Sequence, residues 1–413
     1  MPPKRQQKSN VNGDLESKKP KTSGDEQDFG LKWYEVGKKI KGIPPLVCLD
    51  SKSLEGRNKV AGFDIDWTVL KTKSGKTFAT DANDWDWLYE CVPEKLKELH
   101  NSGHRIIFFS NQSGIEKGKV KISDLQTKCN KIIKKLGIPI FVYFSTGENQ
   151  YRKPSTEVWK HFVEKCNAGV QVDHSKSWYI GDAAGRPKDW APGKKKDFSC
   201  SDRMFAANID INFKTPEEFF LDEKPAKFDW GSVNSKEILG SSSQSRDNQT
   251  YHSKTQEIII MVGMPASGKS SFAKKYLIPF GYVHVNRDTL LTPAKCLKIA
   301  EESLKEGKSV VIDNTNGSKA ARIEYVTLAK KFKFNCRCFK MATDRQLAHH
   351  LNYVRQTLTN GEIRRIPDVG YNVFFKNFEE PTVSEGFSEI LTIQFVPEFE
   401  NERHKEIFLQ WTT

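Results

Sequence analysis

Side chains that could transfer a phosphoryl group stand near the ends of predicted strands in the first half of the chain. Asp64 and Asp66 follow the apolar run 60–63, and Ser110 follows another apolar run. Lys153 precedes a proline further on, and Asp182 ends the short run 178–181. Because ligands in open α/β sheets bind beyond the carboxyl ends of the strands, we expect these five side chains to share one site. A carboxylate in such a site can act as a nucleophile toward phosphorus.

The spacing of Asp64 and Asp66 predicts a cation site. Side chains two residues apart on an extended segment point the same way. Two carboxylates that face one site repel each other unless a cation or a shared proton offsets their charge. Magnesium fits, because hard cations take oxygen ligands.

A second phosphate-handling motif lies far along the chain. The segment Gly263–Ser270 matches Gly-x-x-x-x-Gly-Lys-Ser and follows the apolar run 258–262, a context typical of a nucleoside triphosphate loop. Its backbone amides are expected to cradle phosphates at a helix N-terminus, with Lys269 on the β- and γ-phosphates and Ser270 on magnesium. The predicted ATP-binding residues are Gly263, Met264, Pro265, Ala266, Ser267, Gly268, Lys269 and Ser270.

Three further residues are candidates for phosphoryl transfer from ATP. Asp288 follows a predicted strand and could take the proton of an attacking hydroxyl; the alternative is that it caps a helix. Asp313 ends the next strand, where it could bind magnesium or its water. Arg355 precedes the loop 359–368 and could act on the transferring phosphate, or could form a surface salt bridge.

The elements that must position these residues follow an alternating pattern. Short apolar runs alternate with amphipathic stretches, which predicts parallel α/β sheets in two blocks. The predicted strands are 60–64, 105–110, 141–145 and 178–181, then 257–262, 282–285, 309–312 and 337–341. The predicted helices are 93–101, 123–136 and 155–167, then 269–276, 293–306, 318–332 and 344–358. The predicted domains are a disordered tail (1–28), a first domain (29–226), a flexible linker (227–254) and a second domain (255–413).

Composition indicates a globular protein that binds polyanions. The 413 residues are 37% hydrophobic and carry a net charge of +13, and no apolar run approaches the roughly 20 residues that a membrane span needs. The eight cysteines are scattered, which favours reduced thiols in an intracellular protein. A positive excess attracts polyanions, although any one lysine cluster could be a solvated surface. The clusters are Lys117/Lys119/Lys121, Lys128/Lys131/Lys134/Lys135, Lys188/Lys194/Lys195/Lys196 and Arg364/Arg365.

The order carboxylate pair, hydroxyl, lysine, carboxylate resembles the four motifs of the haloacid dehalogenase superfamily. Longer strings are similar to the bifunctional polynucleotide kinase 3′-phosphatase family, from about residue 30 to the C-terminus. These strings are Lys59–Asp64, Gly181–Arg186, Trp190–Arg203, Thr215–Phe220, Asn286–Thr289 and Asp313–Asn316. The resemblance implies an α/β fold, with a haloacid dehalogenase-like Rossmannoid phosphatase domain before a P-loop kinase domain.

The resemblance also implies roles for the first set of residues. Asp64 would attack phosphorus, and Asp66 would protonate the leaving group and then deprotonate water. Ser110 and Lys153 would hold phosphate oxygens. Asp182, Asp64 and the carbonyl of Asp66 would bind magnesium.

Three other positions draw attention through the same resemblance. Asp197 and Arg203 are implied as supports of the phosphatase site. At the position of Trp67 the family usually has glycine. A glycine would be needed there either because the backbone has a positive φ or because the substrate requires the space. In the second case Trp67 would narrow the pocket or stack on a base.

The short spacings between motifs leave no room for a large lid, so we expect an open cleft suited to the end of a polymer.

The resemblance implies repair of DNA ends, by hydrolysis of 3′-phosphates and ATP-dependent phosphorylation of 5′-hydroxyls. RNA end healing and a non-catalytic end-binding scaffold are the alternatives. Vertebrate members carry a forkhead-associated domain before the phosphatase, for which the first 30 residues are too few. We expect a nuclear monomer whose tail, with the basic run Lys18–Lys21, could serve import and contacts with repair scaffold or ligase proteins.

Overall fold

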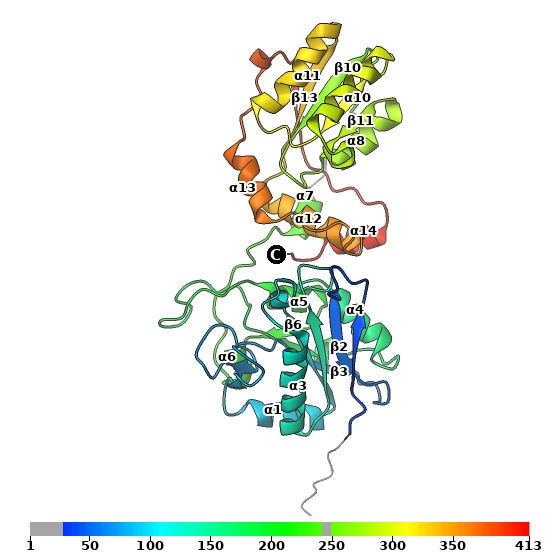
Figure 1. The fold of residues 1–413 in the computed structure, drawn as a ribbon. Coiled ribbons are helices and arrows are strands. Elements are labelled where there is room, and N and C mark those ends of the chain that lie inside the picture. Colours follow the sequence, from blue (N-terminus) through cyan, green and yellow to red (C-terminus); the bar gives the residue numbers. More distant parts are fainter. Residues whose placement is uncertain (1–27, 242–248, 413) are drawn as a thin grey trace, which may run out of the picture.

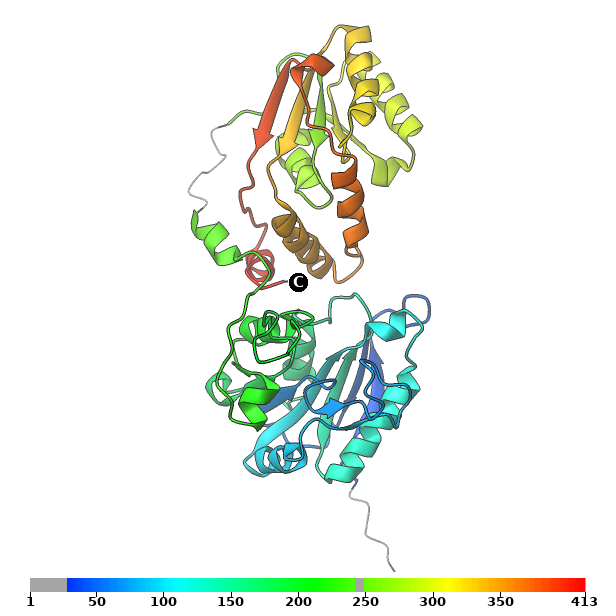
Figure 2. The same ribbon diagram turned by 90° about the vertical axis from the view of Figure 1, so that its left-hand side faces the viewer.

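Two α/β domains lie one above the other in this computed structural model, which describes residues 28–241 and 249–412. Figures 1 and 2 show the C-terminal end of the chain between the two domains. The predicted tail, with Lys18–Lys21, lies outside the described residues.

The first domain is built on a seven-stranded sheet with the order β1-β2-β7-β6-β3-β8-β9. Strands β7, β6, β3, β8 and β9 run parallel, whereas β1 and β2 are antiparallel to their neighbours. The strands are β1 (Lys32–Val36), β2 (Leu46–Asp50), β3 (Lys59–Phe63), β6 (His104–Asn111), β7 (Ile140–Ser145), β8 (Trp178–Ile180) and β9 (Asn212–Lys214). A small ribbon of β4 (Leu70–Lys71) and β5 (Asp86–Trp87) stands apart from this sheet.

Helices cover both faces of this sheet, because both faces of its parallel strands are apolar. Helices α1 (Val92–Asn101) and α3 (Ile122–Leu136) pack on one face. Helices α4 (Glu157–Lys165) and α5 (Ser201–Asn208) pack on the other face. The short helices are α2 (Ser113–Glu116), η1 (His174–Lys176) and α6 (Pro216–Phe220).

The second domain has a five-stranded parallel sheet with the order β11-β12-β10-β13-β14. Its strands are β10 (Glu257–Val262), β11 (Val283–Asn286), β12 (Val310–Asp313), β13 (Asn335–Met341) and β14 (Glu389–Ile393). Helices α10 (Pro293–Lys305) and α11 (Lys319–Phe332) pack on one face, and α8 (Lys269–Tyr276) packs on the other. The remaining helices are η2 (Ile278–Phe280), α9 (Arg287–Leu290), α12 (Arg345–Leu358), α13 (Asp368–Lys376), η3 (Val383–Glu385) and α14 (Glu402–Phe408).

The predicted linker 227–254 contains more structure than its composition suggests. Helix α7 (Ser235–Ser241) lies within it, and Tyr251 is buried in the core of the second domain. The ring of Trp230 stacks on Trp411 with centroids 4.2 Å apart. Aromatic side chains at both ends of the segment therefore anchor it, so it is not uniformly flexible. The serine-rich part at 242–248 lies outside the described residues.

Side chains and backbone groups also join the two domains directly. Asn208 of α5 exchanges two hydrogen bonds with the backbone of Trp411, at 2.7 and 2.9 Å. Gln356 of α12 donates to the carbonyl of Glu148, and Arg364 forms an ion pair with Glu116. The loop before α13 therefore contacts the first domain.

All eight cysteines lie in the described part of the chain, where each is a free thiol. Within 28–241 and 249–412, no helix is long and apolar enough to cross a membrane.

Candidate active sites

Three carboxylates and a lysine converge at the carboxyl ends of β3 and β8. Single oxygens of Asp64, Asp182 and Asp202 lie within 4.8 Å of one another. The ammonium of Lys153 lies 2.7 Å from carboxylate oxygens of both Asp64 and Asp202, and it also donates to the hydroxyl of Tyr179 at 2.6 Å. The structure therefore brings together Asp64, Lys153 and Asp182 as predicted, and it adds Asp202.

The charges of this cluster favour a bound cation. Burial raises the pKa of Asp64 to about 7, although Lys153 opposes the shift. Burial and the neighbouring charge of Asp64 also raise the pKa of Asp182 well above its usual value. Three crowded carboxylates with one lysine carry an excess of negative charge, which a hard cation with oxygen ligands would offset. The donor set therefore fits Mg²⁺, with Asp64, Asp182 and Asp202 as its candidate ligands.

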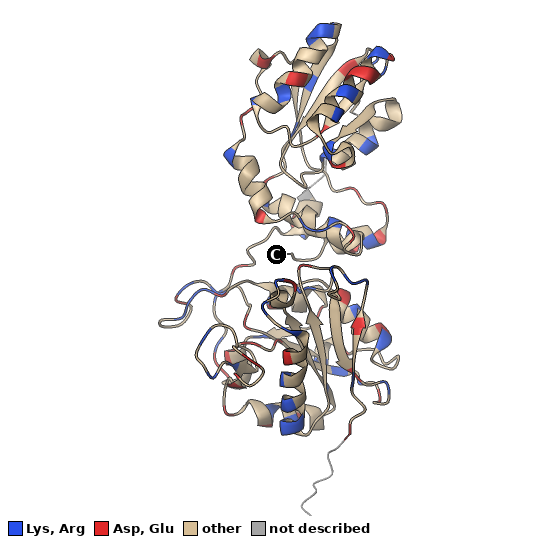
Figure 3. Cartoon of the chain, in the orientation of Figure 1, with Lys and Arg blue, Asp and Glu red and all other residues tan. Residues whose placement is uncertain are grey.

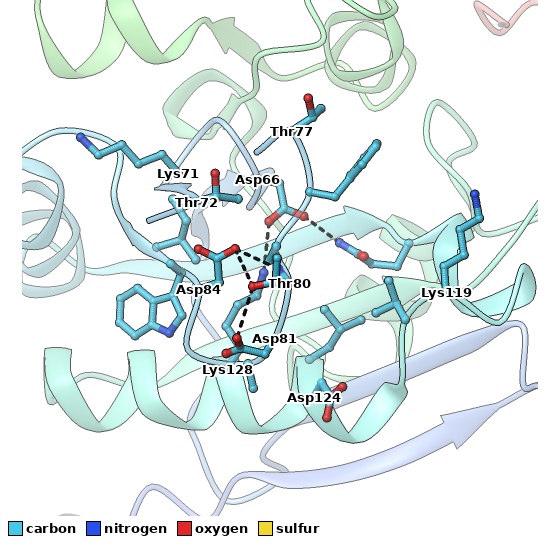
Figure 4. A pocket seen from close by; sticks show the side chains of 18 of the residues that line it. Asp66, Lys71, Thr72, Thr77, Thr80, Asp81, Asp84, Lys119, Asp124 and Lys128 are labelled. Atoms are coloured by element: carbon cyan, nitrogen blue, oxygen red, sulfur yellow. Dashed lines mark hydrogen bonds and ion pairs between the residues drawn. The ribbon is translucent and has the colours of Figure 1, made fainter. Parts of the chain in front are cut away.

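The carboxylate of Asp66 lies outside this cluster, which corrects the expectation that it shares a cation with the carboxylate of Asp64. Lys128 of α3 forms an ion pair with one of its oxygens at 3.1 Å, and Gln112 donates to the other at 3.0 Å. Strand β3 ends at Phe63, so the alternation of an extended strand does not extend to residue 66. Asp66, Gln112 and Lys128 all line a pocket of about 100 Å³, in which Figure 4 labels Asp66 and Lys128. Its carbonyl remains a predicted magnesium ligand.

Other side chains hold the predicted phosphate-binding residues in place. The hydroxyl of Ser110 is buried at the end of β6, where Gln112 donates to it at 2.9 Å. The hydroxyl of Thr68 donates to the carboxylate of Asp182 at 3.3 Å and accepts from its backbone N–H. Gln112 therefore contacts both Ser110 and Asp66.

Asp197 and Arg203 lie where the resemblance implies. Asp197 accepts hydrogen bonds from the backbone N–H groups of Ala184 and Arg186, and from the guanidinium of Arg186 at 2.8 Å. Arg203 donates to the carbonyl of Ala184 at 2.9 Å. Both residues thus support the loop that follows Asp182.

Trp67 adopts the left-handed backbone conformation, with φ of +62°. This conformation costs a non-glycine residue roughly 1–2 kcal/mol. Of the two explanations for a family glycine here, the backbone explanation therefore applies. The indole N–H donates to the carbonyl of Thr77 at 3.2 Å, and the side chain is 38% exposed.

Replacing Lys128 with Gln should lower the kcat of the phosphatase by about tenfold or more, because general acid–base catalysis typically contributes 10²–10⁴-fold and depends on position. Lys128 is buried against Asp66, so its loss would leave that carboxylate without its ion-pair partner. Steady-state hydrolysis of a 3′-phosphorylated oligonucleotide measures the effect. Lys134→Gln is the matched control, since Lys134 lies exposed on the same helix. Equal kcat values for the two variants would contradict a role for Lys128.

The second site is formed by the loop between β10 and α8. Gly263 leaves no space for a side chain, because an added Cβ would lie 2.6 Å from the hydroxyl of Ser267. Gly268 has φ of +93°, which favours glycine. The ammonium of Lys269 donates to the carbonyls of Gly263 and Met264 at 2.9 and 2.8 Å. Burial lowers the pKa of Lys269 to about 8, because the neighbouring carboxylates do not fully offset the loss of water around its ammonium group. The negative oxygens of a polyphosphate could supply the remaining charge.

Asp313 ends β12 beside this loop, in the position that the sequence predicts. The ring of His284 lies 2.8 Å from its carboxylate, and Asn286 donates to it at 3.0 Å. Burial alone would raise the pKa of Asp313, but hydrogen bonds from His284 and Ser270 keep it below the usual value. An ionised Asp313 bonded to Ser270 can hold Mg²⁺ or its water next to the phosphates of ATP.

Asp288 and Arg355 face the same site. Asn286, and not Asp288, caps helix α9, because the side chain of Asn286 accepts from the N–H groups of Asp288 and Thr289. The exposed carboxylate of Asp288 is therefore available to a substrate. The charges of Asp313 and Asp288 raise the pKa of Lys269 and that of Arg355 lowers it, so all three groups lie within electrostatic range of the lysine. Among the described residues, the buried Nε of Arg355 has no hydrogen-bond partner, as an anion-binding arginine requires.

Several site residues gave little signal in the sequence. Asp202 comes from α5, 20 residues after Asp182, and only its place within the family string 190–203 pointed to it. Lys128 was grouped with a surface lysine cluster, but it is buried and faces the site. No pattern marked Gln112 or His284.

Comparison with known proteins places this geometry in a family. A family model described as "Polynucleotide kinase 3 phosphatase" matches residues 59–220, and an AAA domain model matches residues 291–364. A bifunctional polynucleotide phosphatase/kinase of Schizosaccharomyces pombe is 37% identical over 342 residues, which are 83% of this chain and 81% of that protein. The chain belongs to the bifunctional polynucleotide phosphatase/kinase family.

Two further relatives show how the family's domains match the chain. A putative bifunctional polynucleotide phosphatase/kinase of Acanthamoeba polyphaga mimivirus is 34% identical over 88% of this chain and 90% of its own length. A polynucleotide 3′-phosphatase of Saccharomyces cerevisiae is 26% identical over 39% of this chain and 87% of its own length. The predicted α/β class and domain order are confirmed: a polynucleotide phosphatase domain precedes a kinase domain, each built on a sheet with parallel strands. The enzyme class is confirmed as well, with Mg²⁺ and ATP as its cofactors.

Proposed function

We propose that this bifunctional polynucleotide phosphatase/kinase repairs DNA ends, by removing 3′-phosphates and adding phosphates to 5′-hydroxyls. The observation that carries the proposal is the presence of two separate and complete sites on one chain. One holds a candidate nucleophile, Asp64, beside a carboxylate cluster, and the other holds a phosphate-binding loop beside Asp288. The products would be 3′-hydroxyl and 5′-phosphate ends, which polymerase and ligase can use.

In the phosphatase reaction, a carboxylate oxygen of Asp64 attacks phosphorus as the bond from phosphorus to the 3′ oxygen breaks. Asp66, which must enter this step in its protonated form although Lys128 lowers its pKa against the effect of burial, gives its proton to the leaving oxygen. Ser110 and Lys153 hold the phosphate oxygens. Asp66 then takes a proton from water, which attacks the aspartyl-phosphate, releases inorganic phosphate and restores Asp64. Mg²⁺ held by Asp64, Asp182 and Asp202 would neutralise charge on the phosphoryl group.

In the kinase reaction, Asp288 takes the proton of a 5′-hydroxyl, whose oxygen attacks the γ-phosphorus of ATP as ADP leaves. Lys269 holds the β- and γ-phosphates, and Arg355 stabilises the charge on the transferring group. Asp313 and Ser270 would hold the magnesium that accompanies ATP, which would offset charge on the phosphates.

Matched DNA and RNA oligonucleotides that carry a 3′-phosphate or a 5′-hydroxyl test this proposal. We expect both reactions on DNA, and preference for DNA over RNA by kcat/KM. A preference for RNA would favour the end-healing alternative, in which a 2′-hydroxyl is recognised. Absence of both reactions would indicate a non-catalytic end-binding protein.

Basic residues near the phosphatase site favour a polymeric substrate. Lysine and arginine recur along α3 and on the loop that extends beside the first domain (Figure 3). The exposed residues Lys194, Lys195 and Lys196 directly precede Asp197, which supports the loop after Asp182. A phosphate backbone that leaves the site could therefore meet this segment.

Replacing Lys194, Lys195 and Lys196 with Glu should raise KM for a 3′-phosphorylated duplex far more than KM for a small phosphate ester. The charge reversal would repel the DNA backbone, and the effect should weaken at high salt. Steady-state kinetics on both substrates at two salt concentrations measure it. If KM changed equally for both substrates, the lysines would support the fold and not the polymer.

We also propose that the protein is a nuclear monomer whose tail serves import and contacts with repair scaffold or ligase proteins. The support is the basic run Lys18–Lys21 and the expected nuclear substrate. Fluorescent fusions of the full chain, with and without Lys18→Ala, Lys19→Ala and Lys21→Ala, test the import signal. Unchanged nuclear accumulation of the triple variant would refute the import signal.

Sedimentation of the purified protein tests whether it is a monomer. To test the tail contacts, the partners captured by the full chain are compared with those captured by a chain that lacks residues 1–28.

A further inference from the structure

Trp67 combines an unfavourable backbone conformation with a side-chain hydrogen bond to another segment that lines the pocket around Asp66. It follows Asp66 directly, has φ of +62°, and donates its backbone N–H to the carbonyl of Leu70 at 2.7 Å. Its indole N–H reaches the carbonyl of Thr77, ten residues later. Unfavourable backbone conformations persist where the surrounding structure holds them, and they cluster at functional sites.

The segment that Trp67 contacts forms one wall of the pocket around Asp66. Thr77 and Phe78 line this pocket together with Trp67, and the side chain of Phe78 is 82% exposed. Asp84 holds the far end of the segment, because it accepts hydrogen bonds from the N–H groups of Ser74 and Thr80 at 2.7 and 2.9 Å. Figure 4 shows Thr77 at the edge of the pocket, away from Asp84 and Lys128.

The contact from Trp67 fixes the part of this wall that Asp84 does not reach. Thr77 and Phe78 lie between the two residues whose backbone Asp84 holds, and both are exposed. The indole N–H is a side-chain donor to this stretch from the segment that directly follows Asp66. Glycine, the usual family residue, has no side chain that could make the contact.

We propose that Trp67 is a positioning residue that holds the Thr77 wall in place, so that the phosphatase favours a polynucleotide end over a small phosphate ester. The proposal rests on the proposed 3′-phosphatase function of the same site. Trp67, Thr77 and Phe78 line the pocket beside Asp66, so a polymer whose 3′ end reaches Asp66 would extend along this wall. A fixed wall contributes binding only to substrates that reach it, and binding energy from such remote contacts raises selectivity.

Two variants separate the contact from the backbone conformation. Trp67→Phe keeps an aromatic ring on the left-handed backbone but removes the N–H donor, whereas Trp67→Gly removes both the donor and the strain. For each variant, kcat and KM are measured with a 3′-phosphorylated oligonucleotide and with p-nitrophenyl phosphate. The decisive quantity is the ratio of the two kcat/KM values, oligonucleotide over ester.

We expect this ratio to fall about fivefold in both variants, the size that loss of one neutral hydrogen bond produces, with the change mainly in KM for the oligonucleotide. Lys333→Gly is the matched control for backbone relief, because Lys333 has φ of +56° at the exposed C-cap of α11 in the kinase domain. Its ratio should equal that of the wild type.

A ratio within about twofold of the wild type in Trp67→Phe would overturn the proposal, because that variant lacks only the hydrogen bond to Thr77. Equal losses on both substrates would also overturn it, since they would show that Trp67 acts through Asp66 and not through the wall. These outcomes differ from failure of the proposed function, in which the wild-type protein itself would release no phosphate from the oligonucleotide.

Discussion

Asp64→Asn is expected to abolish release of phosphate from a 3′-phosphorylated oligonucleotide and to leave 5′ phosphorylation nearly unchanged. An amide cannot act as the nucleophile, and loss of a nucleophile typically costs several orders of magnitude in kcat. Asp64 lies in the first domain beside Lys153, whereas the kinase residues lie on the second sheet. The measurement is phosphate release and transfer of labelled phosphate from ATP, both on the same preparation.

The control for this variant is Asp222→Asn, which changes an exposed aspartate of the same domain. It should retain both activities. Phosphatase activity of Asp64→Asn above about 1% of the wild type would contradict a nucleophilic Asp64, given the size of effect expected for a nucleophile.

Lys269→Ala is expected to have the converse effect, with kinase activity lost and phosphatase activity retained. The lysine is buried within its loop, where no other lysine could replace its charge on the β- and γ-phosphates. Transfer of labelled phosphate from ATP to a 5′-hydroxyl oligonucleotide measures the loss. Lys274→Ala, at an exposed position of the same helix, should keep the wild-type rate. A wild-type rate in Lys269→Ala would rule out the assigned kinase site.

The positions of these strands were predictable because the candidate catalytic residues stand at the ends of apolar runs in the sequence. The apolar runs before Asp64, Ser110 and Asp182 form β3, β6 and β8, which are adjacent in the sheet. The run before Gly263 forms β10 at the centre of the second sheet. Parallel strands place their carboxyl ends at one edge, so residues far apart in the sequence had to meet there.

Side chains that enter a site from helices were less predictable. Lys128 and its neighbours Lys131, Lys134 and Lys135 look alike in the sequence, and only the packing of α3 on the sheet buries one of them. Asp202 lies in helix α5, and whether its carboxylate reaches the cluster depends on how that helix packs against β8. Contacts of this kind depend on tertiary packing, which periodicity does not specify.

Strands at the sheet edges and contacts between domains were missed for a related reason. The predicted elements omitted the edge strands β1, β9 and β14, the inner strand β2 beside β1, and the short ribbon of β4 and β5. The stacking of Trp411 on Trp230 joins residues 181 positions apart, and single aromatic residues in a polar segment carry no periodic signal. The composition of the segment 227–254 does not show which of its aromatic residues find a partner.

The central claim is that one chain carries two independent activities that act on opposite kinds of nucleic acid end. The most direct measurement uses a gapped DNA duplex with a 3′-phosphate on one side of the gap and a 5′-hydroxyl on the other. After incubation with Mg²⁺ and ATP, mass spectrometry of both strands should show loss of phosphate from the 3′ end and gain of phosphate at the 5′ end. Asp64→Asn should block only the loss, and Lys269→Ala only the gain. If either single variant blocked both changes, or if the wild-type protein made neither, the assignment of two independent sites would be contradicted.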